Sequence, residues 1–289
     1  MMIEPTPDQL AECFYLSTED KRLILEQDEA HNRLGMGIQL GVLRFLGMFL
    51  DNPTDVPRVI VMTIASQLEI TNFRILKRYL KRRQTRFDHR TKLRAYLGLK
   101  TFDRLEILHL LRFVYARLLI HEERLGVLVD LCTRELAQRN VVLPGSTTVE
   151  RLVIHVREHV SKRLYTKLAN RLNKKQIESL ENLLDVGTQD GIRKSPLELL
   201  RRPPDRISST ALSKALNRIE AIRHVGVAKV NLEDVPESRL IAISKYAQVA
   251  WAQSIAKLSR VRCRAPCLYT CSTSRKTQLT MRLRFLMPS

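Results

Sequence analysis

Glycine is scarce in this sequence, and the glycine-rich loops that bind phosphate groups are missing from it. The 289 residues include 10 glycines, and neither G-x-x-x-x-G-K-[ST] nor G-x-G-x-x-G occurs. Gly35-Met36-Gly37 lies inside a helical pattern with no strand before it, so no nucleotide pocket is expected. A G-x-S-x-G turn for a nucleophilic serine is absent as well.

Alternation of apolar and polar residues over the length of a strand is equally rare. Apolar residues recur instead at spacings of three and four, which predicts a nearly all-helical chain. The acidic triads that hold metal ions for phosphoryl transfer need a sheet to carry them, and this pattern offers none. We therefore expect an all-α, multi-helical fold of several small lobes, with no catalytic residues, no metal and no cofactor. Such a protein is not an enzyme.

An export signal and a membrane span are also missing. Met1–Glu12 has no basic segment followed by an apolar one. The longest apolar stretch, Leu34–Leu50, contains Gln39 and Arg44 and is shorter than the ~20 residues that a span requires. The 5 cysteines form an odd set, as expected of reduced thiols. These features predict a cytoplasmic protein with no membrane partner.

Turn-forming residues interrupt the helical pattern and suggest how the chain is divided. A break at Leu143-Pro144-Gly145 separates an N-terminal helical domain, residues 1–142, from a second helical region, residues 143–259. Residues 260–289 form a divergent tail. The main expected helices are Thr18–Glu29, His31–Leu50, Pro57–Leu68, Thr71–Arg83, Arg86–Leu97, Asp103–Ile120, Glu123–Arg139, Thr147–Leu172, Lys174–Val186, Ser209–His224 and Pro236–Ser259.

The chain is strongly basic, and the excess of positive charge begins abruptly. Lys and Arg number 49 against 30 for Asp and Glu, which gives a net charge of +19. Residues 1–73 hold 5 basic and 11 acidic side chains, a net of −6, so the other 216 residues carry +25. A protein that lays one region along phosphates shows such a step. The charge therefore predicts a polyanionic partner, although nonspecifically basic nucleoid proteins share this composition.

The step begins with the densest basic segment of the chain. Arg74–Arg94 contains ten Lys or Arg and one acid, Asp88, with Phe73, Tyr79 and Phe87 interleaved. On a helical wheel the basic and apolar residues of Thr71–Arg83 fall on opposite sides. The residues expected to bind DNA here are Arg74, Lys77, Arg78, Lys81, Arg82, Arg83, Arg86, His89, Arg90, Lys92 and Arg94.

Residues 55–83 have the apolar spacing of a helix-turn-helix. Ala65 is the small residue that lets the first helix approach, and Thr71–Arg83 is the expected recognition helix. Asp55 stands where it can cap the first helix. Glu69 replaces the glycine that is common in the turn, and Arg78 replaces an apolar anchor. The alternative is a plain amphipathic helix with a solvated basic face.

A second basic stretch, Thr148–Gln176, has eight Lys or Arg against two acids. Its candidate contacts to the backbone of an adjoining turn of duplex are Arg157, Lys162, Arg163, Lys167 and Arg171. Lys and Arg are also normal on any exposed helix. His155–His159 fits the H-x-x-E-H pattern of inverted zincins, but the surrounding cations oppose a divalent metal, so we expect none.

The tail differs in kind from the rest. Between Val261 and Ser289 there are six Lys or Arg, no acid and no helical periodicity. Cys263, Cys267 and Cys271 have C-x3-C-x3-C spacing, which fits the radical-SAM cluster motif incompletely, so no cluster is expected. The tail is expected to lack a fixed structure.

An ordered series of short motifs resembles the N-terminal domain of the large replicative transposases of the Tn-three family. The resemblance covers roughly residues 8–259. The residues that carry it are His31-Asn32-Arg33-Leu34-Gly35, Gln39-Leu40, Leu43-Arg44-Phe45-Leu46-Gly47, Pro57, Gln67-Leu68, Thr85-Arg86, His89, Leu97-Gly98, Phe102, Leu143-Pro144-Gly145, Glu150-Arg151-Leu152 and Leu183-Leu184.

The resemblance implies a DNA-binding fragment that recognises the terminal inverted repeats of a transposon. It also implies a bacterial protein of the cytoplasm that is associated with the nucleoid when it is bound to DNA. The family's catalytic Asp-Asp-Glu domain has no matching positions, so cutting and joining are not implied. The break in similarity near residue 260 is interpreted as a truncation with a frameshift. The implied nucleic-acid partner is double-stranded DNA at transposon ends. The implied protein partner is a second copy of this chain or an intact transposase. The alternative is a free-standing helical regulator or competitor of transposition, or an inactive relic.

Overall fold

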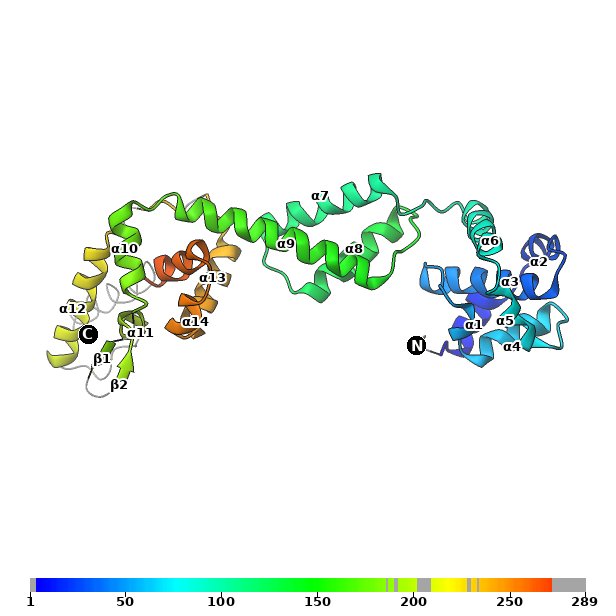
Figure 1. The fold of residues 1–289 in the computed structure, drawn as a ribbon, viewed down its shortest axis with the longest axis horizontal. Helices are drawn as coiled ribbons and strands as arrows, with labels where there is room; N and C mark the ends of the chain where they lie inside the picture. The colour runs from blue at the N-terminus through cyan, green and yellow to red at the C-terminus, as the bar shows by residue number, and fades with distance from the viewer. Residues whose placement is uncertain are drawn as a thin grey trace, which may run out of the picture. The chain divides into compact units, whose positions relative to one another are not determined.

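The computed structural model describes residues 4–185, 187–189, 192–201, 209–227, 230–232 and 234–271. The described chain is all-α apart from one short hairpin, which confirms the fold class (Figure 1). It forms two compact units: residues up to 114 with 125–153, and 115–124 with residues from 154 onward. The sequence break at Leu143-Pro144-Gly145 lies inside the first unit. Among the described residues no helix is long and apolar enough to cross a membrane.

The first unit contains most of the helices. A 3-10 turn, η1, precedes α4, and a second one, η2, precedes α5. Helices α7 and α9 each begin in the first unit and continue into the second. The bounds are α1 Pro7–Phe14, α2 Thr18–Leu25, α3 Ala30–Leu46, η1 Pro53–Asp55, α4 Arg58–Gln67, η2 Phe73–Ile75, α5 Leu76–Tyr79, α6 Arg83–Tyr96, α7 Arg104–Ile120, α8 Leu125–Gln138 and α9 Ser146–Ala169.

Helix α3 is the centre of the first core. Every residue from Leu34 to Leu43 is buried, because α1, α2, α4, α5 and α6 surround the helix. A helix that is apolar on all sides is a core helix in a protein of this size. The long apolar stretch of the sequence therefore has a packing role. Gly41 lets α1 approach closely, since a Cβ there would lie 2.3 Å from Cδ1 of Phe14.

Local capping interactions fix where the surrounding helices begin. Thr6 and Gln9 form a capping box at α1, and Ser17 and Asp20 form another at α2. Each box satisfies amide groups that a helix start would leave unpaired. Asp55 does not cap α4 as expected, because its carboxylate accepts a hydrogen bond from the Asn52 amide instead.

The second unit has its own apolar core. Strands β1 and β2 pair antiparallel, with Thr188 opposite Arg193. The core is built from α10, α11, α12, α14 and residues 260–271. The expected helix Pro236–Ser259 is interrupted at Ala250 and Trp251. The bounds are α10 Lys174–Asn182, β1 Gly187–Gln189, β2 Ile192–Lys194, α11 Pro196–Arg201, α12 Ser209–Val225, α13 Glu237–Val249 and α14 Ala252–Ala256.

The expectation that the tail lacks a fixed structure is wrong for residues 260–271, which are helical. Cys263, Cys267 and Cys271 are 6%, 0% and 0% exposed and belong to the second core. A spacing of four places them on one face of the helix. Cysteine packs as a small apolar residue, so the three thiols supply the apolar face of this helix. Residues 272–289 lie outside the described part of the chain.

Candidate nucleic-acid interface

The segment expected to form one recognition helix, Thr71–Arg83, is divided in two. Asn72 accepts a hydrogen bond from the Arg74 amide and starts η2, which leads directly into α5. The first helical stretch ends near Tyr79, and Arg82 is extended, with φ −105° and ψ 104°, before α6 begins. The prediction of a continuous helix is therefore wrong. A helix-turn-helix with a second helix over the whole of this segment is not formed.

Electrostatic repulsion is one physical reason for the division. In a continuous helix Arg78 and Arg82 would lie four residues apart, and such a like-charged pair costs a few tenths of a kcal/mol. The part of the segment before the break packs into the first core. Leu76 and Tyr79 are 5% and 1% exposed and belong to the first core.

The turn before this segment has the backbone geometry that the sequence suggested. Glu69 has φ 57° and follows α4 at a position where glycine is common. The Ile70 amide donates to the Ala65 carbonyl at 2.8 Å, and the Glu69 amide donates to the Ser66 carbonyl at 3.2 Å. These two bonds form a Schellman motif, which satisfies the last carbonyls of α4. The turn therefore forms without glycine.

A buried polar chain joins the segment to α6. The Tyr79 hydroxyl lies 3.1 Å from His89 Nδ1, and His89 Nε2 lies 3.0 Å from Gln27 Oε1. An amide oxygen can only accept, so Nε2 carries the proton and Nδ1 accepts from the tyrosine. Burial, with help from Lys92, lowers the pKa of His89 to about 4. His89, an expected DNA contact, is a neutral side chain of the interior.

Two arginines of α6 are tied to the loop that follows α3. Arg86 donates to the Asp51 carbonyl at 3.2 Å, and Arg90 donates to the Leu50 carbonyl at 2.7 Å. Arg90 also pairs with the Asp51 carboxylate and lies over the Phe49 ring. These contacts hold α6 against the first core, so Arg86 and Arg90 are partly engaged within the protein.

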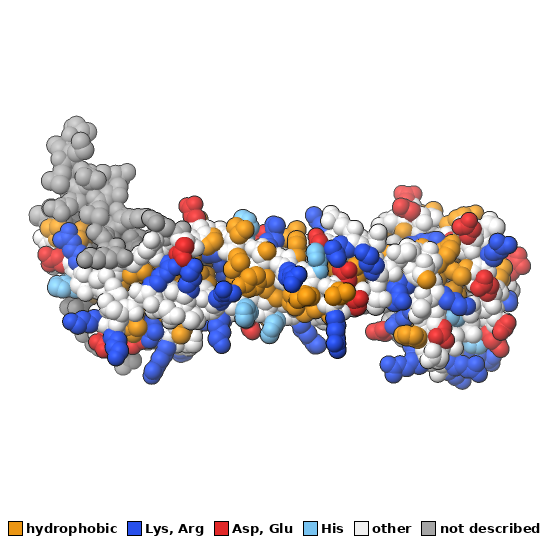
Figure 2. Space-filling view, turned by 90° about the horizontal axis from the view of Figure 1, so that it is seen from above, with side chains coloured by type: hydrophobic (Ala, Val, Ile, Leu, Met, Phe, Trp, Pro, Cys, Tyr) orange, Lys and Arg blue, Asp and Glu red, His pale blue; other side chains and the backbone are white. Residues whose placement is uncertain are grey.

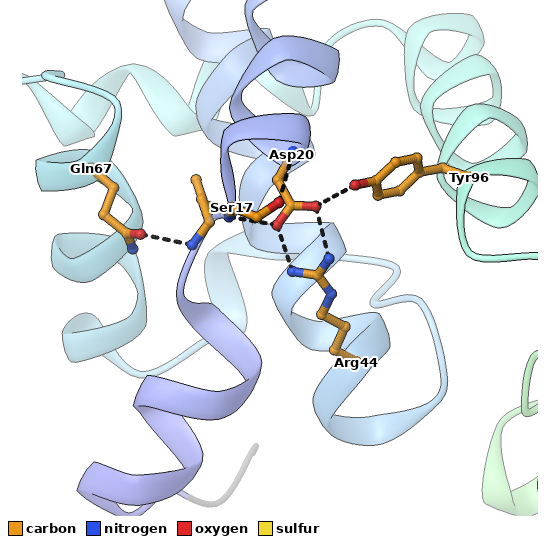
Figure 3. A network of polar contacts seen from close by, with 6 residues as sticks. Ser17, Asp20, Arg44, Gln67 and Tyr96 are labelled. Atoms are coloured by element: carbon orange, nitrogen blue, oxygen red, sulfur yellow. Dashed lines mark hydrogen bonds and ion pairs between the residues drawn. The ribbon is translucent and has the colours of Figure 1, made fainter.

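Asp20 ties the far end of α6 to α2 and α3 (Figure 3). Arg44 donates to both oxygens of Asp20 at 2.8 and 2.7 Å, and the Tyr96 hydroxyl donates at 2.8 Å. Burial alone would raise the pKa of Asp20, but the bonds from Arg44, the Ser17 amide and Tyr96 outweigh it and lower the pKa. The carboxylate is fully buried and needs all of these donors.

The remaining cations of the first stretch are exposed, with the exception of Arg94. None of these cationic side chains forms an ion pair within the described residues. Arg94 is half-buried. Figure 2 shows blue side chains gathered along the lower edge of the lobe at the right, with both acidic and basic side chains scattered over the rest of that face. The exposed cations of the first stretch are Arg74, Lys77, Arg78, Lys81, Arg82, Arg83 and Lys92.

The second stretch lies on α9 and is engaged differently. Arg157 donates to the Glu122 carboxylate and to the Glu123 carbonyl, at 2.8 and 2.7 Å. Arg163 is exposed and donates to the Tyr115 hydroxyl at 2.8 Å. Lys162 is exposed, and no ion pair joins it to an acid of the described chain. Lys167 and Arg171 both pair with the Asp234 carboxylate. Among the five expected contacts, Lys162 is the one whose side chain has no bonded partner in the described residues.

The histidines of the H-x-x-E-H pattern lie on the same helix. His155 and His159 are exposed, and His159 packs against Tyr115 with ring centroids 6.4 Å apart. Across the described ranges, no group of three or more His, Cys, Asp or Glu side chains is arranged to hold a metal ion.

Comparisons with known proteins agree with the resemblance seen in the motifs. A family described as a domain of unknown function, DUF4158, matches residues 2–156. The transposase for transposon gamma-delta from Escherichia coli (strain K12) is 35% identical over 260 residues, which is 90% of this chain and 26% of the relative. The transposase for transposon Tn1546 from Enterococcus faecium is 26% identical over 236 residues, or 82% of this chain and 24% of the relative. The chain spans about a quarter of the length of these relatives.

Proposed function

We propose that this chain, which belongs to the DUF4158 family and corresponds to the N-terminal region of the Tn-three-family transposases, recognises the terminal inverted repeats of a transposon in double-stranded DNA. Transposases act on DNA ends, and the relatives are named as transposases. The role of the chain in DNA transposition is then to bind the transposon ends. Cutting and joining belong to a catalytic domain with an Asp-Asp-Glu triad, which we do not assign to this chain.

The single observation that carries the proposal is the exposed set of cations on η2, α5 and α6. Arg74, Lys77, Arg78, Lys81, Arg82 and Arg83 are all exposed. Cations without a protein partner can replace the counterions that condense on DNA, and the released ions drive binding. Arginines can also contact guanine edges, which supplies sequence preference. The proposed surface is defined by these six residues together with Lys92.

The anchored residues around the surface give it a fixed shape. Tyr79 is buried between α3 and α6, and Arg86 and Arg90 hold α6 to the loop after α3. A cationic surface on rigid elements is ordered before DNA arrives, which lowers the entropic cost of binding. We therefore assign His89, Arg86 and Arg90 to positioning this surface rather than to direct contact with phosphate.

The experiment that tests the proposal measures how duplex affinity depends on salt. Replacing Arg74, Arg78 and Arg82 with alanine should reduce the slope of log K against log salt by about two to three units, at about 0.9 per phosphate contact. The matched control replaces Arg104, Arg112 and Arg134, which are also exposed in the first unit. The control removes the same charge and should leave the slope nearly unchanged.

Selection of binding sites from random duplexes then tests end recognition. A defined motif that matches a transposon terminus supports the proposal. An unchanged slope in the first triple variant, at unchanged helicity, would remove η2, α5 and α6 from the site. Recovery of no motif would reduce the function to nonspecific binding.

A further inference from the structure

The bend between α13 and α14 presents the chain's one tryptophan to solvent. Trp251 is 74% exposed, and Val249, two residues earlier, is 83% exposed. Tyr246 is 42% exposed and lies three residues before Val249 on the same side of α13. Scattered exposed apolar residues are normal, but three large ones within six positions form a patch that the packing of this unit does not use.

The backbone on both sides of Trp251 is held in place. Arg201 of α11 donates to the Ala250 carbonyl at 2.5 Å, and the Ala252 amide donates to Glu198 of the same helix at 3.4 Å. Ala252 and Ile255 are fully buried in the second core. The exposed side chain of Trp251 therefore projects from a bend that is anchored on both sides.

The sequence that carries this patch is cationic. From Leu240 to Cys271 there are five Lys or Arg and no Asp or Glu. Lys245 and Lys257 are exposed and flank the patch in sequence, and neither has an ion pair within the described residues. A patch that bound the apolar surface of another protein would not need this excess of positively charged side chains.

We propose that Tyr246, Val249 and Trp251, with Lys245 and Lys257, form a platform for unpaired nucleobases of single-stranded DNA. Aromatic rings stack on bases of any sequence, and nearby cations hold the phosphate backbone. A base within an intact duplex is already stacked on its neighbours, so the platform prefers a single strand or an opened end. This surface lies in the second unit and does not depend on the duplex-binding surface of the first.

The fluorescence of Trp251 tests the platform directly, because the chain has no other tryptophan. Adding single-stranded oligothymidine should quench it, and a blunt duplex of equal length should quench it less. Trp251→Ala should weaken oligothymidine binding, followed by anisotropy of a labelled oligonucleotide, by about 5- to 150-fold, and Trp251→Phe should retain most of the affinity. The matched control is Tyr15→Ala, since Tyr15 is an exposed aromatic of the first unit.

Three results would overturn the platform. Oligothymidine could fail to bind to the protein. It could also bind without quenching the fluorescence of Trp251, and bind to wild type and Trp251→Ala with equal affinity. Trp251→Ala could instead abolish self-association in sedimentation, which would make the patch a protein interface. The Arg74, Arg78 and Arg82 triple variant should keep the quenching, so failure of this inference and failure of the duplex surface give different results. Circular dichroism checks that each variant is folded.

Discussion

The ring of Tyr79 lies directly on Gly35, so closely that any side chain at position 35 would collide with it. A Cβ on Gly35 would be 2.4 Å from Cγ of Tyr79, far inside van der Waals contact. The contact joins α5 to α3, and Tyr79 in turn reaches His89 of α6. One glycine therefore helps to set the position of the whole cationic surface.

Gly35→Ala should destabilise the first unit by about 1 to 3 kcal/mol through overpacking, and should weaken duplex binding because α5 is displaced. Gly126→Ala in α8 is the control, because nothing lies within 4 Å of its Cβ position. The control should be neutral or stabilising by up to about 1 kcal/mol. Urea unfolding followed by circular dichroism measures both. Equal stability of the two variants would contradict the close packing.

Stability should fall as the pH drops from about 6.5 toward about 4, and His89 should be responsible. The pKa of His89 is lowered to about 4 by burial, whereas an unfolded histidine titrates near its usual value of 6.5. Between these values the unfolded state takes up a proton that the folded state does not, so acid favours unfolding. Above pH 6.5 neither state binds the proton, and the effect vanishes.

His89→Gln should flatten this dependence, with urea midpoints measured across the same pH range. Tyr79→Phe is a useful second variant because it removes the hydroxyl that bonds to Nδ1 but leaves the histidine buried. The stability of Tyr79→Phe should therefore still fall between pH 6.5 and about 4. If wild type and His89→Gln have the same slope, the histidine is not the titrating group.

The buried carboxylate of Asp20 should be the most sensitive polar position of the first unit. Asp20→Ala leaves Arg44 without its partner and should cost about 3 kcal/mol, the low end for a broken buried pair, because the Arg44 side chain is 26% exposed. Tyr96→Phe removes one donor and should cost about 1 kcal/mol. Asp20→Ala combined with Arg44→Met should cost less than Asp20→Ala alone, and a cycle of urea titrations tests this order.

On α9, removing two basic residues should have opposite consequences. Arg157 is bonded to Glu122 and to the Glu123 carbonyl, so Arg157→Ala should lower stability and change the salt slope of duplex binding little. Lys162 is exposed, so Lys162→Ala should leave stability unchanged and lower the slope by about 0.9 if it contacts a phosphate. Thermal melts and salt titrations of both variants would show whether this helix joins the interface.

The three cysteines near the end of the described chain should resist alkylation. Burial raises the pKa of Cys271 to about 12 and raises that of Cys267 further, so neither thiol ionises near neutral pH. Cys13 is only half-buried and should react first in native protein. Mass spectrometry after timed treatment with iodoacetamide gives the order. Fast labelling of Cys267 would show that residues 260–271 are not packed.

The sequence by itself determined the helical class and the basic segment. Apolar residues at spacings of three and four predicted helices, because side chains at those intervals share one face of a helix. The basic, acid-poor segment after Phe73 identified the candidate DNA-binding cations. The series of short motifs also indicated the likeness to transposases that the comparisons show. These features depend on local order along the chain, which a sequence displays directly.

Only the tertiary structure decided which side chains are free. It divided Thr71–Arg83, packed Tyr79 on Gly35, buried His89, and engaged Arg157 with Glu122. It also packed Cys263, Cys267 and Cys271 into the second core and left Trp251 outside it. Each outcome depends on contacts between residues distant in the sequence, and the periodicity of a single segment carries no information about its partners.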